Sequence, residues 1–236
     1  MSGQKFGGPD THAESGRTRG RGRPQKISRE QIICAARSVA PEVLTMQAVA
    51  DVLGVDPTSL NYHVGGKAGL RELVARDVFE SELRRVVLPA EGDWRQVLTL
   101  FATALRDAVV VVGTLVPYLR PSHAGGSATL ASVERVLRAL VEAGFGIEEA
   151  RGALMLVTDA AASAGRDALT AQRGGDPDVA ELAAALSVVP ETNFPMLRDV
   201  VAISQRPRRD AEEDRLSFDL TVIIAGLQHR LTTNRR

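Results

Sequence analysis

Residues 45–63 constrain the fold of this chain more than any other stretch of its sequence. Ala50 and Gly54 are four residues apart, and Leu60 follows six residues later. Two helices that cross at a steep angle need a small residue where they come closest, and the turn between them needs a residue that accepts positive φ. Leu60 is placed to anchor the second helix to a core. This spacing predicts a helix-turn-helix, which leaves the other face of the second helix free to enter a major groove.

The rest of the sequence predicts an all-α protein without a sheet. Ser28 and Gln31 have the spacing of a capping box, so the first helix is expected to begin at Ser28 and to end before Pro41. Apolar residues recur at helical spacing nearly to the end of the chain and are interrupted by Gly and Pro. We expect nine or ten helices. They cover residues 28–40, 45–53, 56–63, 67–88, 94–112, 129–142, 148–172, 178–186, 194–204 and 211–231.

Composition divides the chain into three parts. Residues 1–26 are rich in Gly, Arg, Ser and Thr, and we expect them to form a disordered basic arm. Residues 27–75 are the predicted three-helix head, and residues 76–236 are the predicted helical body. Up to residue 76 the chain has 11 Lys and Arg against 7 Asp and Glu, so this part carries +4 and the remainder −4. A positive end suits a protein that presents its head to a polyanion.

Several classes of protein are disfavoured by the composition. The chain has a single cysteine, Cys34, so an internal disulfide framework is excluded, which suits a reducing cytoplasm. Cys34 is expected to be an inert packing residue of the first helix. No apolar run approaches the roughly 18–20 residues of a membrane span, and the N-terminus does not resemble a signal peptide. No two of the four histidines have metal-ligand spacing, and no nucleophile–base pair or phosphate loop is evident. We therefore expect no enzyme, metal site, cofactor or membrane partner.

The free face of the second helix carries side chains suited to DNA. They are small or able to form hydrogen bonds, and none is acidic. Thr, Ser and Asn can donate to and accept from base edges, and Tyr and His can reach phosphates or ribose. The predicted reading residues are Pro57, Thr58, Ser59, Asn61, Tyr62 and His63.

The stretch from Thr45 to Lys67 resembles the DNA-binding head of the tetracycline-repressor family, and the resemblance covers about residues 28–75. The family pattern is matched without a gap by Leu60, His63, Val64 and Lys67. The body resembles the family only in its helical layout and length.

Two positions depart from the family pattern. The family usually has Tyr where this chain has Asn61, so the contact made there must differ. It usually has Ser or Asn where this chain has Gly66, so the fourth helix is expected to lack a side-chain cap. The resemblance implies that Thr45 and Gln47 also touch DNA. It further implies that Lys67 and its backbone N–H, at a positive helix N-terminus, meet a phosphate.

The resemblance also implies the partners and the mechanism. The chain is expected to act as a homodimeric, cytoplasmic transcriptional repressor on double-stranded DNA with a pseudo-palindromic operator. An unidentified small-molecule effector is expected to bind the body and to shift the fourth helix, which changes the separation of the two heads. A twofold dimer would place the reading helices about one DNA turn, ~34–36 Å, apart.

A second DNA-binding element is predicted upstream of the head. Arg21-Gly22-Arg23-Pro24 matches the core of an AT-hook, in which arginines lie in the narrow minor groove of A·T-rich DNA. Its position ahead of the helix-turn-helix resembles the arm of a homeodomain. The alternative is a solvated tail, which this composition fits equally well.

The ligand pocket is predicted from scattered residues of the body. The candidates are Trp94, Phe101, Leu105, Tyr118, His123, Thr158 and Asp159. Thr158 and Asp159 interrupt a nearly apolar helix, which indicates either a cavity wall or an exposed stripe. The apolar candidates on residues 94–112 fit a core as well as a cavity, and His123 fits either a loop surface or a pocket.

The last predicted helix has apolar residues on much of its circumference, so it must be covered on two sides. The predicted dimer interface consists of Leu216, Leu220, Ile223, Ile224 and Leu227. By resemblance, this helix forms a four-helix bundle with an earlier helix, either residues 148–172 or residues 194–204.

Two other functions are considered. The first is a constitutive DNA-binding dimer or activator with a filled body and no ligand, because many Ala and Val with few aromatics fit either a small cavity or a tight core. The second is a helical enzyme that merely contains the hairpin, and it ranks last because no cluster of catalytic residues is evident.

Overall fold

The computed structural model describes residues 27–120, 126–205 and 211–234. Within these ranges the chain forms ten α-helices and two short 3-10 helices, with no strand, so the predicted all-α fold is confirmed. The helices are α1 (Arg29–Arg37), η1 (Pro41–Val43), α2 (Met46–Leu53), α3 (Pro57–Val64), α4 (Gly66–Arg85), α5 (Trp94–Val112), η2 (Gly113–Tyr118), α6 (Ser127–Ala143), α7 (Ile147–Gln172), α8 (Pro177–Ser187), α9 (Pro195–Ser204) and α10 (Ala211–Asn234).

The first three α-helices form the head, and each begins at a polar side chain that caps it. Ser28 Oγ accepts from the Gln31 N–H (3.2 Å), while Gln31 Oε1 accepts from the Ser28 N–H (2.9 Å), so the predicted capping box is confirmed. Thr45 caps α2, and Asp56 caps α3 with Pro57 at the first helical position. The sequence therefore fixes where these helices begin.

The crossing of α2 and α3 has the predicted construction. Gly54 adopts φ 66° in the turn, which is the left-handed conformation that glycine accepts without a Cβ penalty. Ala50 is fully buried in α2, and Leu60 is fully buried in α3. They share the core of the head with Ile32 of α1 and Val49 of α2, both of which are also inaccessible to solvent.

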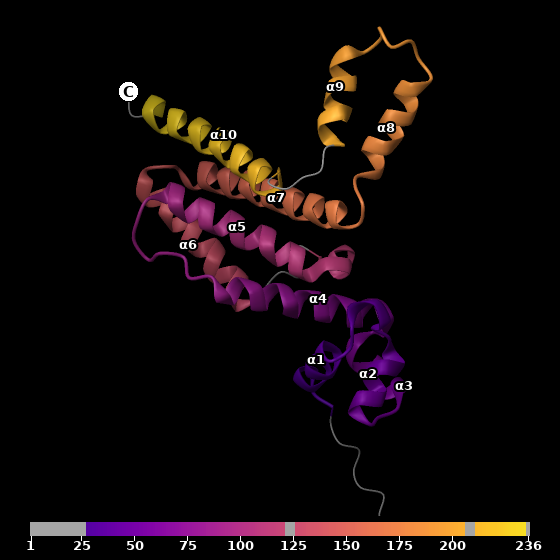
Figure 1. The fold of residues 1–236 in the computed structure, drawn as a ribbon. Coiled ribbons are helices and arrows are strands. Elements are labelled where there is room, and N and C mark those ends of the chain that lie inside the picture. The colour runs from indigo at the N-terminus through magenta and orange to yellow at the C-terminus, as the bar shows by residue number, and fades with distance from the viewer. Residues whose placement is uncertain (1–26, 121–125, 206–210, 235–236) are drawn as a thin grey trace, which may run out of the picture.

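Helix α4 runs without interruption from the head into the body (Figure 1). In the head it contacts α1, α2 and α3, and in the body it contacts α5, α6 and η2. The predicted domain boundary between residues 75 and 76 lies inside this helix. Gly65 and Gly66, at φ 69° and 95°, join it to α3. It ends at Arg85, earlier than predicted.

Helix α5 is the central helix of the body. It contacts α4, α6 and η2 and has its largest contact with α7. The segment Trp94–Tyr118 is long and apolar enough to span a membrane, but half of its most apolar window is buried within the protein. Its apolar side chains therefore form the core of a helical bundle.

Helix α7 presents mostly small residues to this core, so α5 can approach closely. Ala153, Ala161 and Ala164 are buried along that face, and Gly165 is placed at the nearest point. A Cβ at Gly165 would lie 2.8 Å from the Val109 side chain, tighter than real Cβ contacts allow. The absence of a side chain at residue 165 thus sets the α5–α7 spacing.

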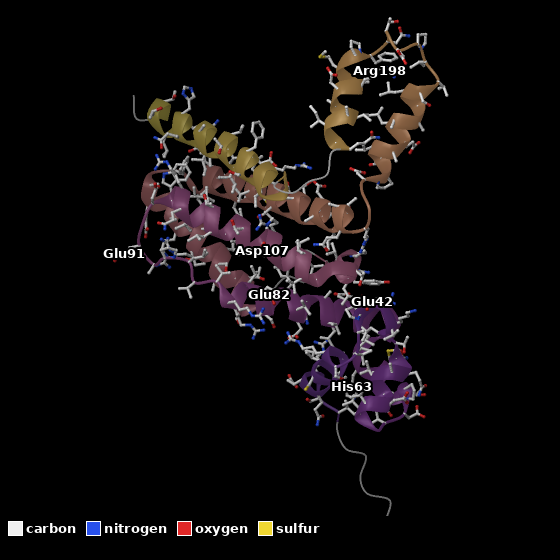
Figure 2. The ribbon with its side chains drawn as sticks, viewed as in Figure 1. Glu42, His63, Glu82, Glu91, Asp107 and Arg198 are labelled. Atoms are coloured by element: carbon white, nitrogen blue, oxygen red, sulfur yellow. The ribbon has the colours of Figure 1, made fainter. Side chains whose placement is uncertain are left out.

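The remaining helices lie on the far side of α7 from α6. Helix α10 lies along α7, and α8 and α9 project away from the bundle as a hairpin (Figure 1). Arg198 of α9 braces this hairpin, because its guanidinium donates to the carbonyls of Leu186 (2.8 Å), Val189 (3.1 Å), Pro190 (3.0 Å) and Asn193 (3.0 Å). Figure 2 labels Arg198 on this hairpin, distant from the head.

Candidate nucleic-acid interface

The outer face of α3 is exposed along its length. Leu60 alone is buried, while Thr58, Ser59 and Asn61 are exposed and Tyr62 keeps 90% of its surface open to solvent. His63 is half-buried at the C-terminal end of α3. Figure 2 labels it in the head.

Tyr62 and His63 also contact each other edge to face, with ring centroids 5.8 Å apart. Pro57 is half-buried at the start of the helix. The six predicted reading residues thus lie together on one short, anchored helix, and contacts of these residues with DNA remain a prediction.

The start of α2 supplies two more predicted contact residues, and each already has a partner within the head. Thr45 Oγ1 accepts from the Ala48 N–H at 3.1 Å, as an N-cap does. Gln47 Nε2 donates to Asp51 Oδ1 at 2.7 Å. This bond uses one of the two amide hydrogens of Gln47. Asp51 adds a carboxylate that the sequence pattern did not single out.

The N-termini of α3 and α4 differ in charge. The Asp56 carboxylate accepts hydrogen bonds from the Thr58 side chain and backbone, which lower the pKa of Asp56 below its usual value. A negative cap at α3 is favourable for the helix dipole but opposes a phosphate there. Lys67 is exposed in the first turn of α4, whose N-cap Gly65 makes no side-chain hydrogen bond. The predicted lack of a side-chain cap on α4 is confirmed, and its first N–H groups are open to an anion.

Three predicted site residues lie outside the described residues. They are Arg21 and Arg23 of the predicted minor-groove arm, and His123 of the predicted pocket.

The other predicted pocket residues lie in different environments. Trp94, Phe101 and Leu105 are buried in the core, and Trp94 contacts Phe145 edge to face with centroids 5.4 Å apart. Tyr118 is half-buried, and its hydroxyl accepts from Arg71 Nη1 at 2.6 Å. The sequence could not distinguish a cavity wall from a core, because both are apolar stripes on one helix.

Thr158 and Asp159 follow each other on α7, where Thr158 is half-buried and Asp159 is exposed. This exposure matches the alternative of an exposed stripe.

The described part of the body contains hollows, and the lining of the two described next includes no predicted pocket residue. The larger, of about 880 Å³, is lined by polar side chains such as Asp167, Thr170, Arg173 and Arg215, where α7, the hairpin and α10 meet. The smaller, of about 200 Å³, lies between α5 and α10. Among the described residues, no group of three or more His, Cys, Asp or Glu side chains is placed to hold a metal ion.

The surface of α10 differs from the predicted dimer interface. Leu216, Leu220 and Leu227 are buried inside the protomer, where α10 lies on α7, so they are not available to a partner. Ile223 and Ile224 are half-buried against the same core. The exposed apolar side chains of α10 are instead Phe218, at 68%, and Val222, at 55%. Phe218 and Val222 belong to the apolar circumference of the predicted helix, but the sequence could not tell which face points inward, because α10 has apolar residues on both faces.

The lone cysteine also differs from its prediction. Cys34 is exposed on α1 and is not an inert packing residue. The buried face of α1 consists of Ile32, Ala35 and Ala36, and residue 34 points away from it. The helical phase of α1 was the signal that could have corrected this prediction.

Comparison with known proteins gives consistent matches over the head and the body. Residues 88–231 match the family model described as "Tetracyclin repressor-like, C-terminal domain". The chain is 28% identical over 214 residues to the tetracycline repressor protein class A from transposon 1721 of Escherichia coli, a match covering 87% of this chain and 92% of that protein.

Solved structures share the fold. A possible TetR family transcriptional regulator from Streptomyces coelicolor A3(2) superposes with a TM-score of 0.67 at 24% identity, covering 86% of this chain and 99% of that one. The Streptomyces coelicolor protein ActR, solved in complex with actinorhodin, superposes with a TM-score of 0.65 at 21% identity, covering 88% of this chain and 99% of that one.

Proposed function

The chain belongs to the tetracycline-repressor family of transcriptional regulators, and from that premise we propose a homodimeric repressor that binds a pseudo-palindromic operator and is released by a small molecule. The observation that carries the proposal is the outer face of α3. One buried leucine, Leu60, fixes this helix to the head, and the hydrogen-bonding side chains around it are exposed. A helix held in this way can enter a major groove without rearranging the head.

The proposed DNA-reading surface combines the exposed face of α3 with the N-termini of α2 and α4. Thr58, Ser59 and Asn61 are offered to base edges, and Tyr62 is offered to the sugar-phosphate backbone. Lys67 and the uncapped N–H groups of α4 are offered to a phosphate, because the start of a helix attracts anions. Arg21 and Arg23 of the arm are proposed to follow the adjacent minor groove.

The proposed dimer interface is the outer face of α7 and α10. These helices lie side by side, and their exposed apolar side chains include Met155 and Leu156 on α7 and Phe218 and Val222 on α10. A twofold copy of this surface forms a four-helix bundle in which the apolar groups are shielded from water. Proteins seldom leave apolar side chains of this size clustered on a surface without a partner.

The effector is proposed to bind in the body against α5. Phe101 and Leu105 are closely packed there, so a ligand that enters has to displace them. Helix α5 contacts α4 directly, and α4 carries the head. Binding that depends on such a displacement couples the ligand to the head, because the ligand stabilises only the displaced arrangement. ActR in complex with actinorhodin is a fold relative that has been solved with a ligand.

A constitutive DNA-binding dimer is the second candidate. The same burial of Trp94, Phe101 and Leu105 favours it, because a core that stays filled offers no space to an effector.

The first experiment is selection of bound sequences from a random duplex pool by the purified full-length protein at physiological salt. An enriched inverted repeat is the expected result. The matched control is Ser59→Glu, which adds a carboxylate to the exposed face of α3 and should enrich nothing. If the wild-type protein enriches no sequence over non-specific binding, the proposal of operator recognition is wrong.

The selected duplex then tests the effector. Small molecules that raise the melting temperature of the protein bind the folded state. The repressor proposal expects some of these to release the duplex. Binders that stabilise the protein but leave every complex intact would favour the constitutive dimer.

A further inference from the structure

Glu80 is the one charged residue among the buried side chains of the described chain, with 8% of its surface exposed. It lies on α4, between the apolar residues Phe79 and Leu83 of the core. A buried carboxylate is costly unless hydrogen bonds replace its water. The partners of Glu80 therefore indicate what keeps it there.

These partners belong to the first turn of α6. Glu80 Oε2 accepts from the Ala128 N–H at 3.1 Å, and Oε1 accepts from the Thr129 N–H at 3.3 Å. Thr129 Oγ1 also donates to Oε1. The N-cap of α6 is Gly126, which has no side chain to cap the helix. Glu80 takes that role from another helix, and its negative charge faces the positive end of the α6 dipole.

Gly126 is required for this arrangement. A Cβ at residue 126 would lie 1.9 Å from Glu80 Cδ and 2.2 Å and 2.3 Å from the two carboxylate oxygens. Any side chain there displaces the Glu80 carboxylate from α6. Glu80, Gly126, Ala128 and Thr129 together are named the Glu80 clasp.

The clasp lies beside a polar contact between the head and α4. Asp77, three residues before Glu80, forms an ion pair with Arg37 of α1 at 2.6 Å. The same Arg37 nitrogen donates to Ser81 Oγ at 2.5 Å. Arg37 of the head and the first turn of α6 therefore contact the same turn of α4. A displacement of the start of α6 reaches the head through one turn of α4.

We propose that Glu80 is a positioning residue that fixes the separation of the two DNA-reading heads by tying α4 to the first turn of α6. The inference rests on the proposed function, because head separation matters only in an operator-binding dimer. Among the described residues, Glu80 makes the hydrogen bonds between α4 and α6, so without the clasp this turn of α4 loses its polar link to α6. The heads then sample more separations, and the operator, which needs one separation, is bound more weakly.

The chain provides its own probe for this test. Cys34 is its single cysteine and is exposed on α1. A spin label on Cys34 of both copies reports the distance between heads by pulsed electron paramagnetic resonance, in the full-length dimer without DNA or effector. We compare Glu80→Gln, Gly126→Ala and Thr129→Val with the wild type. The matched control is Glu134→Gln, because Glu134 is exposed on α6 and pairs with Arg138 of the same helix at 3.1 Å.

The wild type and Glu134→Gln should give the same narrow distance distribution. Glu80→Gln and Gly126→Ala should give a broader or shifted distribution, although one removes the charge and the other displaces it. Thr129→Ser, which keeps the hydroxyl, should restore the distribution that Thr129→Val changes. On the selected duplex, Glu80→Gln should lower the affinity by about 2- to 30-fold.

Three outcomes overturn the inference. Folded, dimeric Glu80→Gln and Gly126→Ala with the wild-type distribution would overturn the clasp while leaving the repressor proposal intact. A lower melting temperature with unchanged distances and unchanged affinity for the duplex would make Glu80 merely structural. Absence of dipolar coupling in the wild-type protein would overturn the dimer itself, and with it this inference. Thr129→Val keeps the test decisive if Glu80→Gln does not fold.

Discussion

Asp77 and Glu80 lie one turn apart on α4 and contact different parts of the molecule, since Asp77 pairs with Arg37 of the head and Glu80 caps α6 of the body. Helix α4 therefore connects the head to α6 through these two contacts. Besides the packing of α1, α2 and α3 on α4, the head contacts α4 through an ion pair that is partly open to solvent, and α6 contacts α4 through a buried carboxylate.

Asp77→Asn should loosen the head on α4 with little effect on stability. The Arg37 side chain is 44% exposed, so the pair contributes at most about 1 kcal/mol to the free energy of unfolding. We expect a broader Cys34–Cys34 distance distribution and a small change in melting temperature. Glu82→Gln is the control, because Glu82 pairs with Arg85 within α4. Equal distributions for Asp77→Asn and the wild type would remove the Arg37 contact from head positioning.

Leu60→Ala should unfold the head, because Leu60 is the fully buried anchor of α3. Truncating a buried leucine costs about 2–5 kcal/mol. Chemical denaturation followed by circular dichroism measures this destabilisation. Ser59→Ala, on the exposed face of the same helix, should leave stability nearly unchanged. A destabilisation well below the range expected for a buried leucine would mean that α3 is held by other contacts.

Asn61→Ala should change base preference at one position of each half-site. The Asn61 side chain is exposed on α3, where a bidentate contact with a base discriminates by about 1–3 kcal/mol. Repeating the duplex selection with this variant measures the change. Identical base preference in the two selections would remove Asn61 from the readout.

Phe218→Glu combined with Val222→Glu should give folded monomers. Both side chains are exposed, so their replacement disrupts the proposed bundle without opening the core. Leu220→Glu should instead unfold the body, since Leu220 is buried within the protomer. Light scattering and circular dichroism separate the two outcomes. Dimers that persist in the Phe218→Glu, Val222→Glu variant would place the interface on another surface, such as the hairpin of α8 and α9.

Deletion of residues 1–26 should weaken operator binding and make it less dependent on salt. Removing one phosphate-neutralising side chain reduces the slope of log affinity against log salt by about 0.9. With Arg21 and Arg23 both neutralising phosphates, the slope should change by about 1.8. Titrations at several salt concentrations measure it. An unchanged slope would mean that the arm does not touch DNA.

The head was predictable because its signals are local. Ser28, Thr45 and Asp56 cap the helices that follow them, and Gly54 marks the turn. Each signal acts over a few neighbouring residues, so the adjacent sequence is enough to read it. The start of each of the three α-helices of the head could therefore be placed from the sequence, whereas the short 3-10 helix η1 was not predicted.

The body was less predictable because its contacts are distant in the sequence. Glu80 reads as one more charged residue of an amphipathic helix, and its partner Thr129 lies 49 residues away. Helix α10 carries apolar residues on two faces, and only its packing on α7 decides that Leu220 faces inward and Phe218 outward. Periodicity identifies a helix, but it does not identify the neighbour that each face meets.

The anchoring of α3 by a single buried leucine has a consequence for descent. Thr58, Ser59, Asn61 and Tyr62 can each be exchanged without disturbing the core that Leu60 completes. A duplicated gene can therefore acquire a new target by a few point mutations while its product still folds, dimerises and senses the old signal. Paralogues that arise in this way keep the effector response of the parent and differ from it in operator specificity.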